Sequence, residues 1–267
     1  MYAFDYVKPT SLQEALNALA QEDAQPIAGG QTLIPTLKSR LAQPSILVDL
    51  TAIAEMRGIC EGEGTVAIGA ATRHGEVDAS ELVRSKIPAL AKLASRVGDP
   101  QVRNRGTIGG SLANNDPSAC YPAAALGLGA TLKTSSGRAI VADDYFQGMF
   151  DTALEEGELL VSIDFPVPKR AAYMKFEQPA SHFPLVGVFV AELADGARVA
   201  VTGASESGVF RWAEAEAALS SDFAPSAGEG LKASADGLIG DLHASPAYRA
   251  HLIGVMTKRA VAAAVER

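Results

Sequence analysis

The stretch PIAGGQTLIPTLKSRLAQ, residues 26–43, places two adjacent glycines between a short apolar run and a helix-like pattern. Glycine permits close approach of the backbone and the positive φ angles that point successive N–H groups to one side. A helix that begins just after the glycines would add free N–H donors and a positive dipole end. The stretch is therefore compatible with a phosphate-binding loop, although a Gly-Gly pair after a strand is more often a tight turn.

A second stretch of similar composition, TIGGSLANNDP at residues 107–117, follows about eighty residues later. Each stretch has a hydroxyl residue at or just past the glycine pair and a leucine shortly after it. Neither stretch matches the G-x-G-x-x-G of a Rossmann fold or the G-x-x-x-x-G-K-[ST] of a P-loop. Two such loops in one chain predict a single dinucleotide site, whose diphosphate is held from both sides by the backbone of Gly29, Gly30, Gly109 and Gly110.

The composition indicates a globular protein. The chain has 267 residues, of which 48% are hydrophobic and 20% charged, and its formal net charge is −8. Nucleic-acid-binding proteins usually present a basic face, and membrane-surface helices are usually rich in Lys and Arg. No secretory signal is apparent, and the longest apolar run is about half of a membrane span. We expect a cytoplasmic protein with no nucleic-acid partner and no transmembrane segment.

Metal centres and catalytic side chains are not indicated. A zinc site needs roughly four ligands, and the four histidines are scattered along the chain. Two cysteines cannot supply the roughly four thiolates of an iron–sulfur cluster. Cys60 ends an apolar run and is expected in the core. No Ser-His-Asp set and no carboxylate pair is apparent, so we expect no catalytic residue. Redox chemistry would come from an organic cofactor or from a partner.

The order of expected helices and strands favours an α+β fold over a doubly wound sheet. Ser11 and Glu14 predict a capping box at the first helix, and Ser245-Pro246 predicts the start of the last one. Asp195-Gly196 predicts a hairpin. Residues 99–117, rich in Gly, Asn, Asp and Pro, are expected to be irregular, and residues 210–219 helical.

The two glycine stretches, together with DLHASPAYRAHLIGVMTKRAV at residues 241–261, resemble the FAD-binding medium subunit of the molybdenum hydroxylases. This family includes the carbon monoxide dehydrogenase medium chain and the flavin domain of xanthine dehydrogenase. The resemblance covers essentially the whole chain. It implies an FAD-binding domain of the vanillyl-alcohol oxidase (PCMH) type at residues 1–175, with two α/β subdomains split near 55–60. A small α+β C-terminal domain with an antiparallel sheet would follow at residues 176–267.

The resemblance also implies non-covalent FAD and a role in an enzyme complex. A small subunit would carry two [2Fe–2S] clusters and a large subunit the molybdenum cofactor, in a dimer of heterotrimers. Electrons would pass from the clusters to FAD and on to an external acceptor, and the chain alone would be inactive on the organic substrate. The implied cofactor-binding residues are Ala28, Gly29, Gly30, Gln31, Thr32, Leu33, Thr107, Ile108, Gly109, Gly110, Ser111, Asn115, Asp116 and Phe183.

Three positions bear on how closely the chain follows this family. Cys120 stands where many members carry an acid, and Glu177 stands where relatives are often basic. Phe183 falls where some relatives place an aromatic ring beside the flavin, and phenylalanine can stack on a ring but offers no hydroxyl. A stand-alone FAD-dependent reductase or oxidase, and an FAD-binding scaffold without turnover, remain alternatives.

Other polar residues have simpler interpretations. Arg103 and Arg105 would either contact the cofactor or a partner, or form surface ion pairs. Lys38 and Arg40 are expected to be solvated, since the loop amides already serve a phosphate. His74 and His182 are expected to be structural or exposed. Asp49 is expected to cap the end of a strand.

Overall fold

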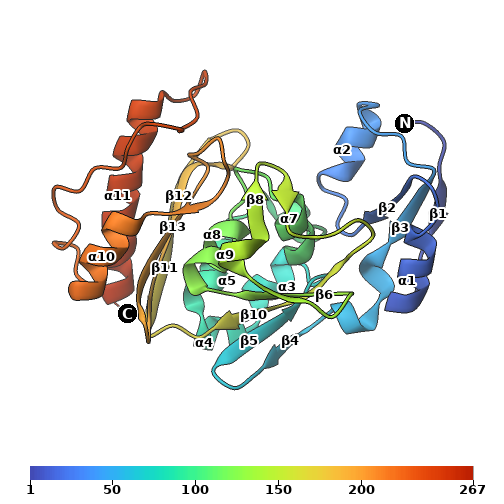
Figure 1. Ribbon diagram of the computed structural model, residues 1–267, viewed down its shortest axis with the longest axis horizontal. Coiled ribbons are helices and arrows are strands. Elements are labelled where there is room, and N and C mark those ends of the chain that lie inside the picture. Colours follow the sequence, from blue (N-terminus) through green and yellow to red (C-terminus); the bar gives the residue numbers. More distant parts are fainter. Residues whose placement is uncertain (267) are drawn as a thin grey trace.

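The structure is a computed structural model that describes residues 1–266. The N-terminal residues of the chain form the first of its larger sheets. Three short parallel strands pair in the order β1-β3-β2. In Figure 1 this unit forms one end of the molecule, coloured blue. Its elements are β1 (Asp5–Val7), α1 (Leu12–Leu19), β2 (Ala24–Ile27), α2 (Leu33–Lys38) and β3 (Ile46–Asp49), followed by the turns η1 (Leu50–Ala52) and η2 (Ala54–Met56).

Local capping in this unit follows the sequence closely. The Ser11 hydroxyl accepts from the Glu14 amide at 3.3 Å, which confirms Ser11 as the N-cap of α1. The Glu14 carboxylate accepts from the amide of Thr10 at 2.9 Å, one residue before the cap, so the reciprocal bond of the predicted capping box is not formed. Asp49 accepts from the Thr51 amide at 2.8 Å, so its expected role as a strand-end cap is confirmed.

The second sheet is antiparallel and has the order β4-β5-β10-β6-β7. Its central strand β10 arrives late in the chain and closes the sheet between β5 and β6. The strands are β4 (Ile59–Glu61), β5 (Thr65–Gly69), β6 (Thr131–Thr134), β7 (Ala139–Val141) and β10 (Leu160–Pro166). The helices are α3 (His74–Ala79), α4 (Glu81–Lys86), α5 (Pro88–Ser95), α6 (Pro100–Arg103), α7 (Ile108–Asn114), α8 (Tyr121–Leu128) and α9 (Ala142–Tyr145), with a hairpin of β8 (Phe146–Gly148) and β9 (Asp151–Thr152).

Two expectations for this unit were wrong. Residues 99–117 are not irregular, because Asp99 and Thr107 cap the short helices α6 and α7 with their side chains. Helix caps therefore use the same polar residues that suggested a loop. Cys60 is exposed rather than in the core, because β4 is an edge strand of the sheet and its cysteine faces outward.

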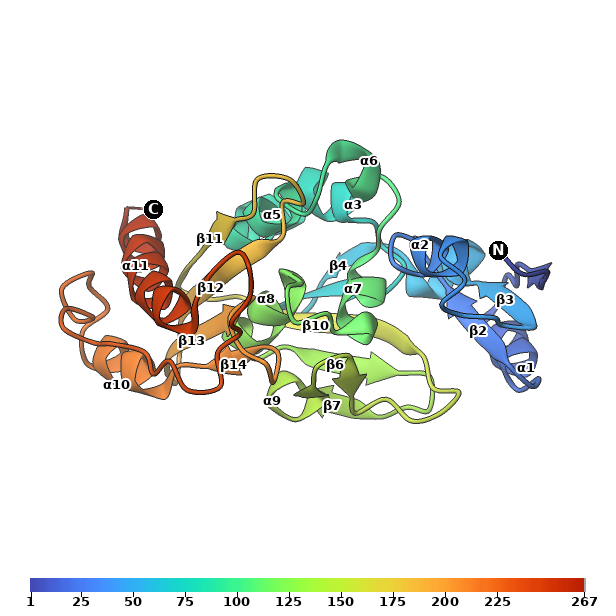
Figure 2. The ribbon, with the colours of Figure 1, turned by 90° about the horizontal axis from the view of Figure 1, so that it is seen from above.

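The third sheet is a sequential antiparallel sheet covered by two helices (Figure 2). The Asp195-Gly196 hairpin is confirmed, with Leu193 paired to Gly196. The predicted helix at 210–219 begins only at Ala213, because Phe210 and Arg211 pair with the preceding strand. The elements are β11 (Arg170–Glu177), β12 (Pro184–Leu193), β13 (Gly196–Thr202), β14 (Phe210–Arg211), α10 (Ala213–Ser221) and α11 (Pro246–Val265). The third sheet starts at Arg170.

Helix α8 joins the second and third units. All eight of its residues are buried, so it is apolar on every side and packs between sheets. A Cβ on Gly127 would lie 2.9 Å from the Phe189 ring on β12, which shows how closely the helix approaches the third sheet. The expected α+β architecture, with an antiparallel C-terminal sheet, is confirmed.

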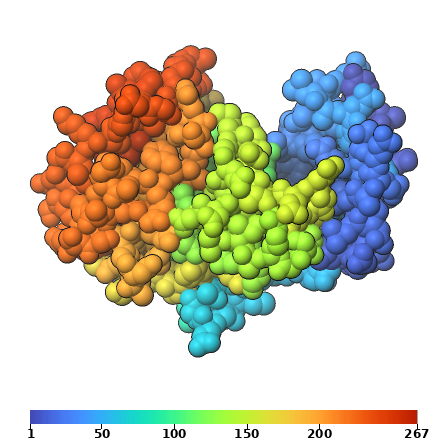
Figure 3. Space-filling model, in the orientation of Figure 1, coloured from blue at the N-terminus to red at the C-terminus, as the bar shows by residue number. Residues whose placement is uncertain are grey.

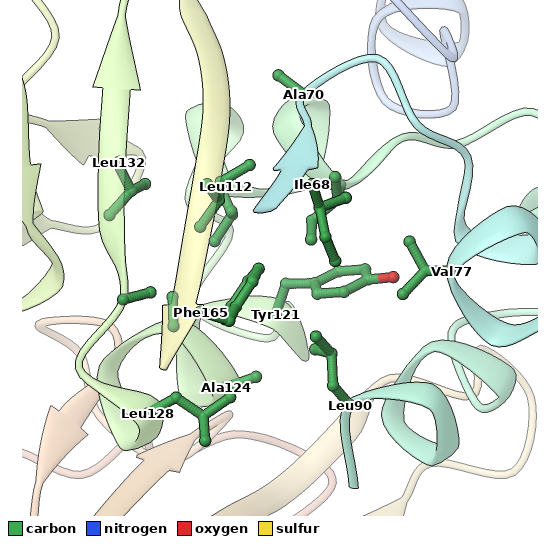
Figure 4. Packing of buried hydrophobic residues seen from close by; sticks show 14 of the residues in the cluster. Ile68, Ala70, Val77, Leu90, Leu112, Tyr121, Ala124, Leu128, Leu132 and Phe165 are labelled. Carbon is green, nitrogen blue, oxygen red and sulfur yellow. The ribbon is translucent and has the colours of Figure 1, made fainter. Parts of the chain in front are cut away.

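Tyr121 on α8 carries a buried hydroxyl with no partner among residues 1–266. Figure 4 shows its ring among Ile68 and Leu90, with the hydroxyl directed toward Val77. An unpaired buried hydroxyl carries a desolvation cost, so Y121F should raise the free energy of unfolding by about 1 kcal/mol. Urea unfolding measures this change. As a contrast, Tyr6 donates to Asp49, so Y6F should lower stability; a loss in Y121F as large as that in Y6F would contradict the assignment.

Candidate dinucleotide cleft

A cleft of about 730 Å³ opens between the first and second units and is bordered by a loop of the third. Figure 3 shows the hollow between the blue N-terminal unit and the green part of the chain. Its volume lies within the range of cofactor pockets, roughly 300–1,000 Å³. The main contributions come from the loop between β2 and α2, the start of α7, and the loop between β11 and β12.

Most of the site residues expected from the sequence meet in this cleft. All of them line it except Ile108 and Asn115. Ile108 is fully buried in the hydrophobic core. Asn115 donates through Nδ2 to the carbonyls of Gly148 and Asp151, at 2.7 and 2.8 Å, so its side chain supports the β8–β9 hairpin instead. The two glycine pairs, distant in sequence, thus share one cleft.

The first glycine loop leaves its backbone donors free. Among residues 1–266, no acceptor is bonded to the amides of residues 29–33, and the Gln31 side chain folds back to the Gly29 carbonyl at 3.1 Å. Gly30 has φ of +70°, a conformation that favours glycine. This run of unpaired N–H groups ends at the N-terminus of α2, where a helix leaves its first donors unsatisfied. The loop can therefore accept a phosphate without any rearrangement of its own hydrogen bonds.

The second glycine loop is different, because its amides are already used within the protein. Ile108 N donates to Thr72 O at 3.0 Å and Gly109 N to Ala70 O at 2.8 Å. Gly110 N donates to the Thr107 hydroxyl at 3.1 Å, and Ser111 N to the Thr107 carbonyl at 3.1 Å. This loop therefore offers a smooth backbone surface and the Ser111 hydroxyl, rather than a row of free donors.

Close packing also explains why some of these positions are glycine. A Cβ on Gly29 would lie 2.3 Å from the Arg105 carbonyl oxygen, and a Cβ on Gly109 would lie 2.4 Å from the Ala70 Cβ. These two glycines let the loops pack against neighbouring backbone. A Cβ on Gly110 would meet only the Thr107 Oγ1 within 4 Å, at 2.9 Å. Gly110 is thus the glycine whose missing side chain keeps the cleft itself open.

Two further residues line the cleft without being among the expected cofactor-binding residues. His74 is 5% exposed and its Nδ1 has no partner among residues 1–266. Burial, with a smaller contribution from Arg103, lowers the pKa of His74 to about 4, so the ring is neutral near pH 7. Cys120 also lines the cleft, and burial raises the pKa of its thiol. Both side chains become part of the site only through folding of the second unit.

Glu177 lies outside the cleft and its charge is neutralised. Its carboxylate pairs with Arg96 at 3.1 Å and with Lys175 at 3.4 Å. Although partial burial opposes it, these two cations lower the pKa of Glu177. The acid at this position therefore adds no unpaired negative charge beside the cleft.

The remaining polar residues make modest contacts. Arg103 donates to the carbonyls of Val97 and Gly98, at 3.2 and 2.9 Å, and does not line the cleft. Lys38 and His182 are exposed, as is Arg40, whose guanidinium lies 5.7 Å from the Tyr2 ring centroid. Within residues 1–266, no group of three or more His, Cys, Asp or Glu residues could hold a metal. No helix in that range is long and apolar enough to span a membrane.

Glu158 lines the cleft and is held by Arg138. Hydrogen bonds from Arg138, followed by those from the Glu155 amide and Ser136, keep its pKa well below the usual range. A depressed folded-state pKa stabilises the protein above the unfolded value of about 4.3, and this contribution is lost as the pH falls below it.

E158Q should therefore be less stable than wild type by about 2 kcal/mol at pH 7, through loss of charge-assisted hydrogen bonds. The difference should narrow as the pH falls from 4 toward 2. Urea unfolding at pH 7 and pH 3 checks this. E155Q is the control, since Glu155 is exposed and pairs with Arg138 only at 3.4 Å. Equal losses at both pH values would contradict the assignment.

Two glycine loops thus meet at one cleft, between a parallel and an antiparallel unit, and form a candidate site for a dinucleotide cofactor. Comparisons with known proteins specify it further. The family described as the FAD binding domain in molybdopterin dehydrogenase matches residues 2–168. The carbon monoxide dehydrogenase medium chain of Hydrogenophaga pseudoflava is 36% identical, with 99% of this chain and 98% of the relative covered.

Further relatives agree. The 6-hydroxypseudooxynicotine dehydrogenase complex subunit alpha of Paenarthrobacter nicotinovorans is 34% identical, over 99% of this chain and 95% of the relative. The crystal structure of quinoline 2-oxidoreductase from Pseudomonas putida 86 contains a chain with a TM-score of 0.89 and 33% identity, covering 99% of this chain and 98% of that one. The chain belongs to the FAD-binding medium subunits of the molybdenum hydroxylases, a family of oxidoreductase subunits whose cofactor is FAD.

Proposed function

We propose that this chain is the electron-transfer subunit of a heterotrimeric molybdenum hydroxylase and that it holds FAD non-covalently in the cleft. The observation that carries this proposal is the meeting of both glycine loops at one cleft, with a run of free backbone amides at residues 29–33 on one side. Backbone N–H groups beside a helix N-terminus suit the charge of a diphosphate.

Different residues of the cleft would contact different parts of the cofactor. The free amides of the first loop would bind phosphate oxygens, and Thr32 and Ser111 add hydroxyl donors at the cleft surface. Gly110 leaves space for the ligand, and Phe183, 50% exposed, offers an aromatic face for stacking. When bound, FAD supplies the electron-transfer chemistry, taking electrons from the [2Fe–2S] clusters of a small subunit and passing them to an external acceptor.

The partners follow from the kind of relative that the chain resembles. Relatives are termed a medium chain, a medium subunit or a subunit of a dehydrogenase complex. We infer a small [2Fe–2S] subunit and a large subunit with the molybdenum cofactor, assembled as a dimer of heterotrimers. The names of the relatives include carbon monoxide, nicotine and xanthine. We therefore infer that the substrate is selected by the large subunit rather than by this chain.

The test is to purify the chain by itself and with its partners. The isolated chain should be yellow, release FAD on denaturation, and oxidise no organic substrate; co-expression with the small and large subunits should restore turnover. Robust oxidation of an organic substrate by the isolated chain would overturn the electron-transfer role. A colourless chain that takes up no FAD on titration would overturn the cofactor site.

A further inference from the structure

Lys175 on β11 is a buried cation that touches two separate segments of the cleft wall. Its side chain is fully buried, and its Nζ donates to the carbonyl of Arg96 at 2.7 Å and to that of His182 at 2.6 Å. The third partner is the Glu177 carboxylate at 3.4 Å. An ammonium group removed from water is stable only with such partners, so these contacts fix the positions of the groups that make them.

Both carbonyls belong to segments that border the cleft. Arg96 ends α5 and is followed by Val97 and Gly98, which line the cleft; His182 is followed by Phe183, which also lines it. The loop around His182 is closed on itself, since Gln178 N donates to Phe183 O at 2.8 Å and His182 N to Gln178 O at 2.9 Å. A tie at the His182 carbonyl therefore sets the position of the whole loop.

We propose that Lys175 is a positioning residue that ties the end of α5, in the second unit, to the 178–183 loop of the third unit, and so holds the cleft in the form that retains FAD. The Arg96–Glu177 ion pair, at 3.1 Å, joins the end of α5 to the last residue of β11, directly before this loop. We call these three residues the wall latch: Arg96, Lys175 and Glu177. The inference rests on the proposed function in one respect, the presence of FAD in this cleft.

A cysteine thiol in the cleft can be used to measure how often the cleft wall opens. Cys120 lines the cleft and is 6% exposed, whereas the second cysteine, Cys60, is exposed on an edge strand. In a C60S background, a thiol reagent therefore reports on Cys120 alone. Local opening of the wall exposes this thiol. Because the charge of Lys175 lowers the pKa of Cys120 and that of Glu177 raises it, labelling is followed over a range of pH, and the rates are compared at equal thiolate fraction, where they report the population of the open form. The measurement on flavin-free protein does not depend on where FAD binds.

The variant is K175M, which removes the ammonium while keeping most of the side-chain volume. In the flavin-free full chain, labelling of Cys120 should become at least about tenfold faster, as expected for the loss of charge-assisted hydrogen bonds. In the FAD-loaded chain, flavin release, followed by the rise of flavin fluorescence, should accelerate by a similar factor. E177Q, which keeps both carbonyl bonds of Lys175, should show smaller increases in both rates.

The matched control is R249M. Arg249 is another buried cation of the third unit, and it donates to the carbonyls of Leu185 and Gly203 at 2.6 and 2.8 Å, neither of which lines the cleft. R249M should lower the melting temperature while leaving both the Cys120 labelling rate and the flavin release rate at the level of the C60S parent.

Several outcomes would overturn the proposal. One is labelling of Cys120 in K175M at the parental rate; another is equal acceleration in R249M, which would indicate general loosening. Faster labelling with unchanged flavin release would overturn the role in FAD retention. If K175M does not fold, the E177Q variant decides the outcome. Cys120 labelling and flavin release in E177Q at the rates of the C60S parent would overturn the proposal. A wild-type chain that binds no FAD would instead refute the proposed function, while the labelling comparison still tests the latch.

Discussion

Replacement of Gly110 by leucine should abolish FAD retention while leaving the fold nearly intact. A side chain at this position meets only the Thr107 hydroxyl, and Gly110 has no positive φ that would strain another residue. Its bulk would enter the cleft instead. We expect FAD affinity to fall by at least about 100-fold, equivalent to about 2.7 kcal/mol. Disturbance of the Thr107 cap should cost no more than about 1 kcal/mol of stability.

Two measurements on the same sample separate these effects. Titration with FAD, followed by quenching of flavin fluorescence, gives the affinity, and thermal unfolding of the flavin-free protein gives the stability. G228L is the control, because Gly228 has open space around it, no positive φ, and lies away from the cleft. Tight FAD binding by G110L would show that the ligand does not pass over α7.

Replacement of Gly29 by alanine should greatly lower the stability of the flavin-free fold, whereas G110L should mainly lower FAD affinity. The added Cβ would lie 2.3 Å from the Arg105 carbonyl oxygen and 2.5 Å from the Gly106 Cα. These are backbone atoms, which cannot rotate away as the end of a side chain can. Overpacking of this kind usually costs 1–3 kcal/mol, so we expect a loss of about 3 kcal/mol and, as a result, weak FAD binding.

Urea unfolding of flavin-free protein tests the G29A prediction, with G110A as the comparison. Both variants add one methyl group to a glycine loop of the same cleft, but only G29A places it against backbone. We expect G110A to lose at most about 1 kcal/mol. Similar stability losses in the two variants would mean that the first and second units do not pack through Gly29.

Much of the fold could be predicted from local patterns. Ser11, Ser245 and the Asp195-Gly196 turn carry their signals in neighbouring residues, and each element begins or turns where the pattern placed it. Phe210-Arg211 did not behave as predicted, because pairing with β13 outweighs the helical tendency of the residues that follow. The position of β10 between β5 and β6 is likewise set by long-range pairing, which no local pattern reveals.

The two glycine loops of the site could be predicted from the sequence, but the hydrogen bonding of their backbone amides could not. The sequence treats the two glycine pairs as similar, yet the amides of residues 29–33 are free while those of residues 108–111 are used inside the protein. That difference depends on Ala70, Thr72 and Thr107, which the fold brings to the second loop. Asn115 follows the motif in sequence, but its left-handed conformation at the end of α7 directs its side chain to the β8–β9 hairpin.

The contact of Gly29 with the Arg105–Gly106 backbone has a thermodynamic consequence. The cleft draws on the first unit and on the second, so a ligand that fills it binds only when the two are docked. Binding free energy then adds to the free energy of docking, by about 2.7 kcal/mol when free ligand is at 100 times its dissociation constant. The loaded chain should therefore unfold at a higher temperature than the flavin-free protein.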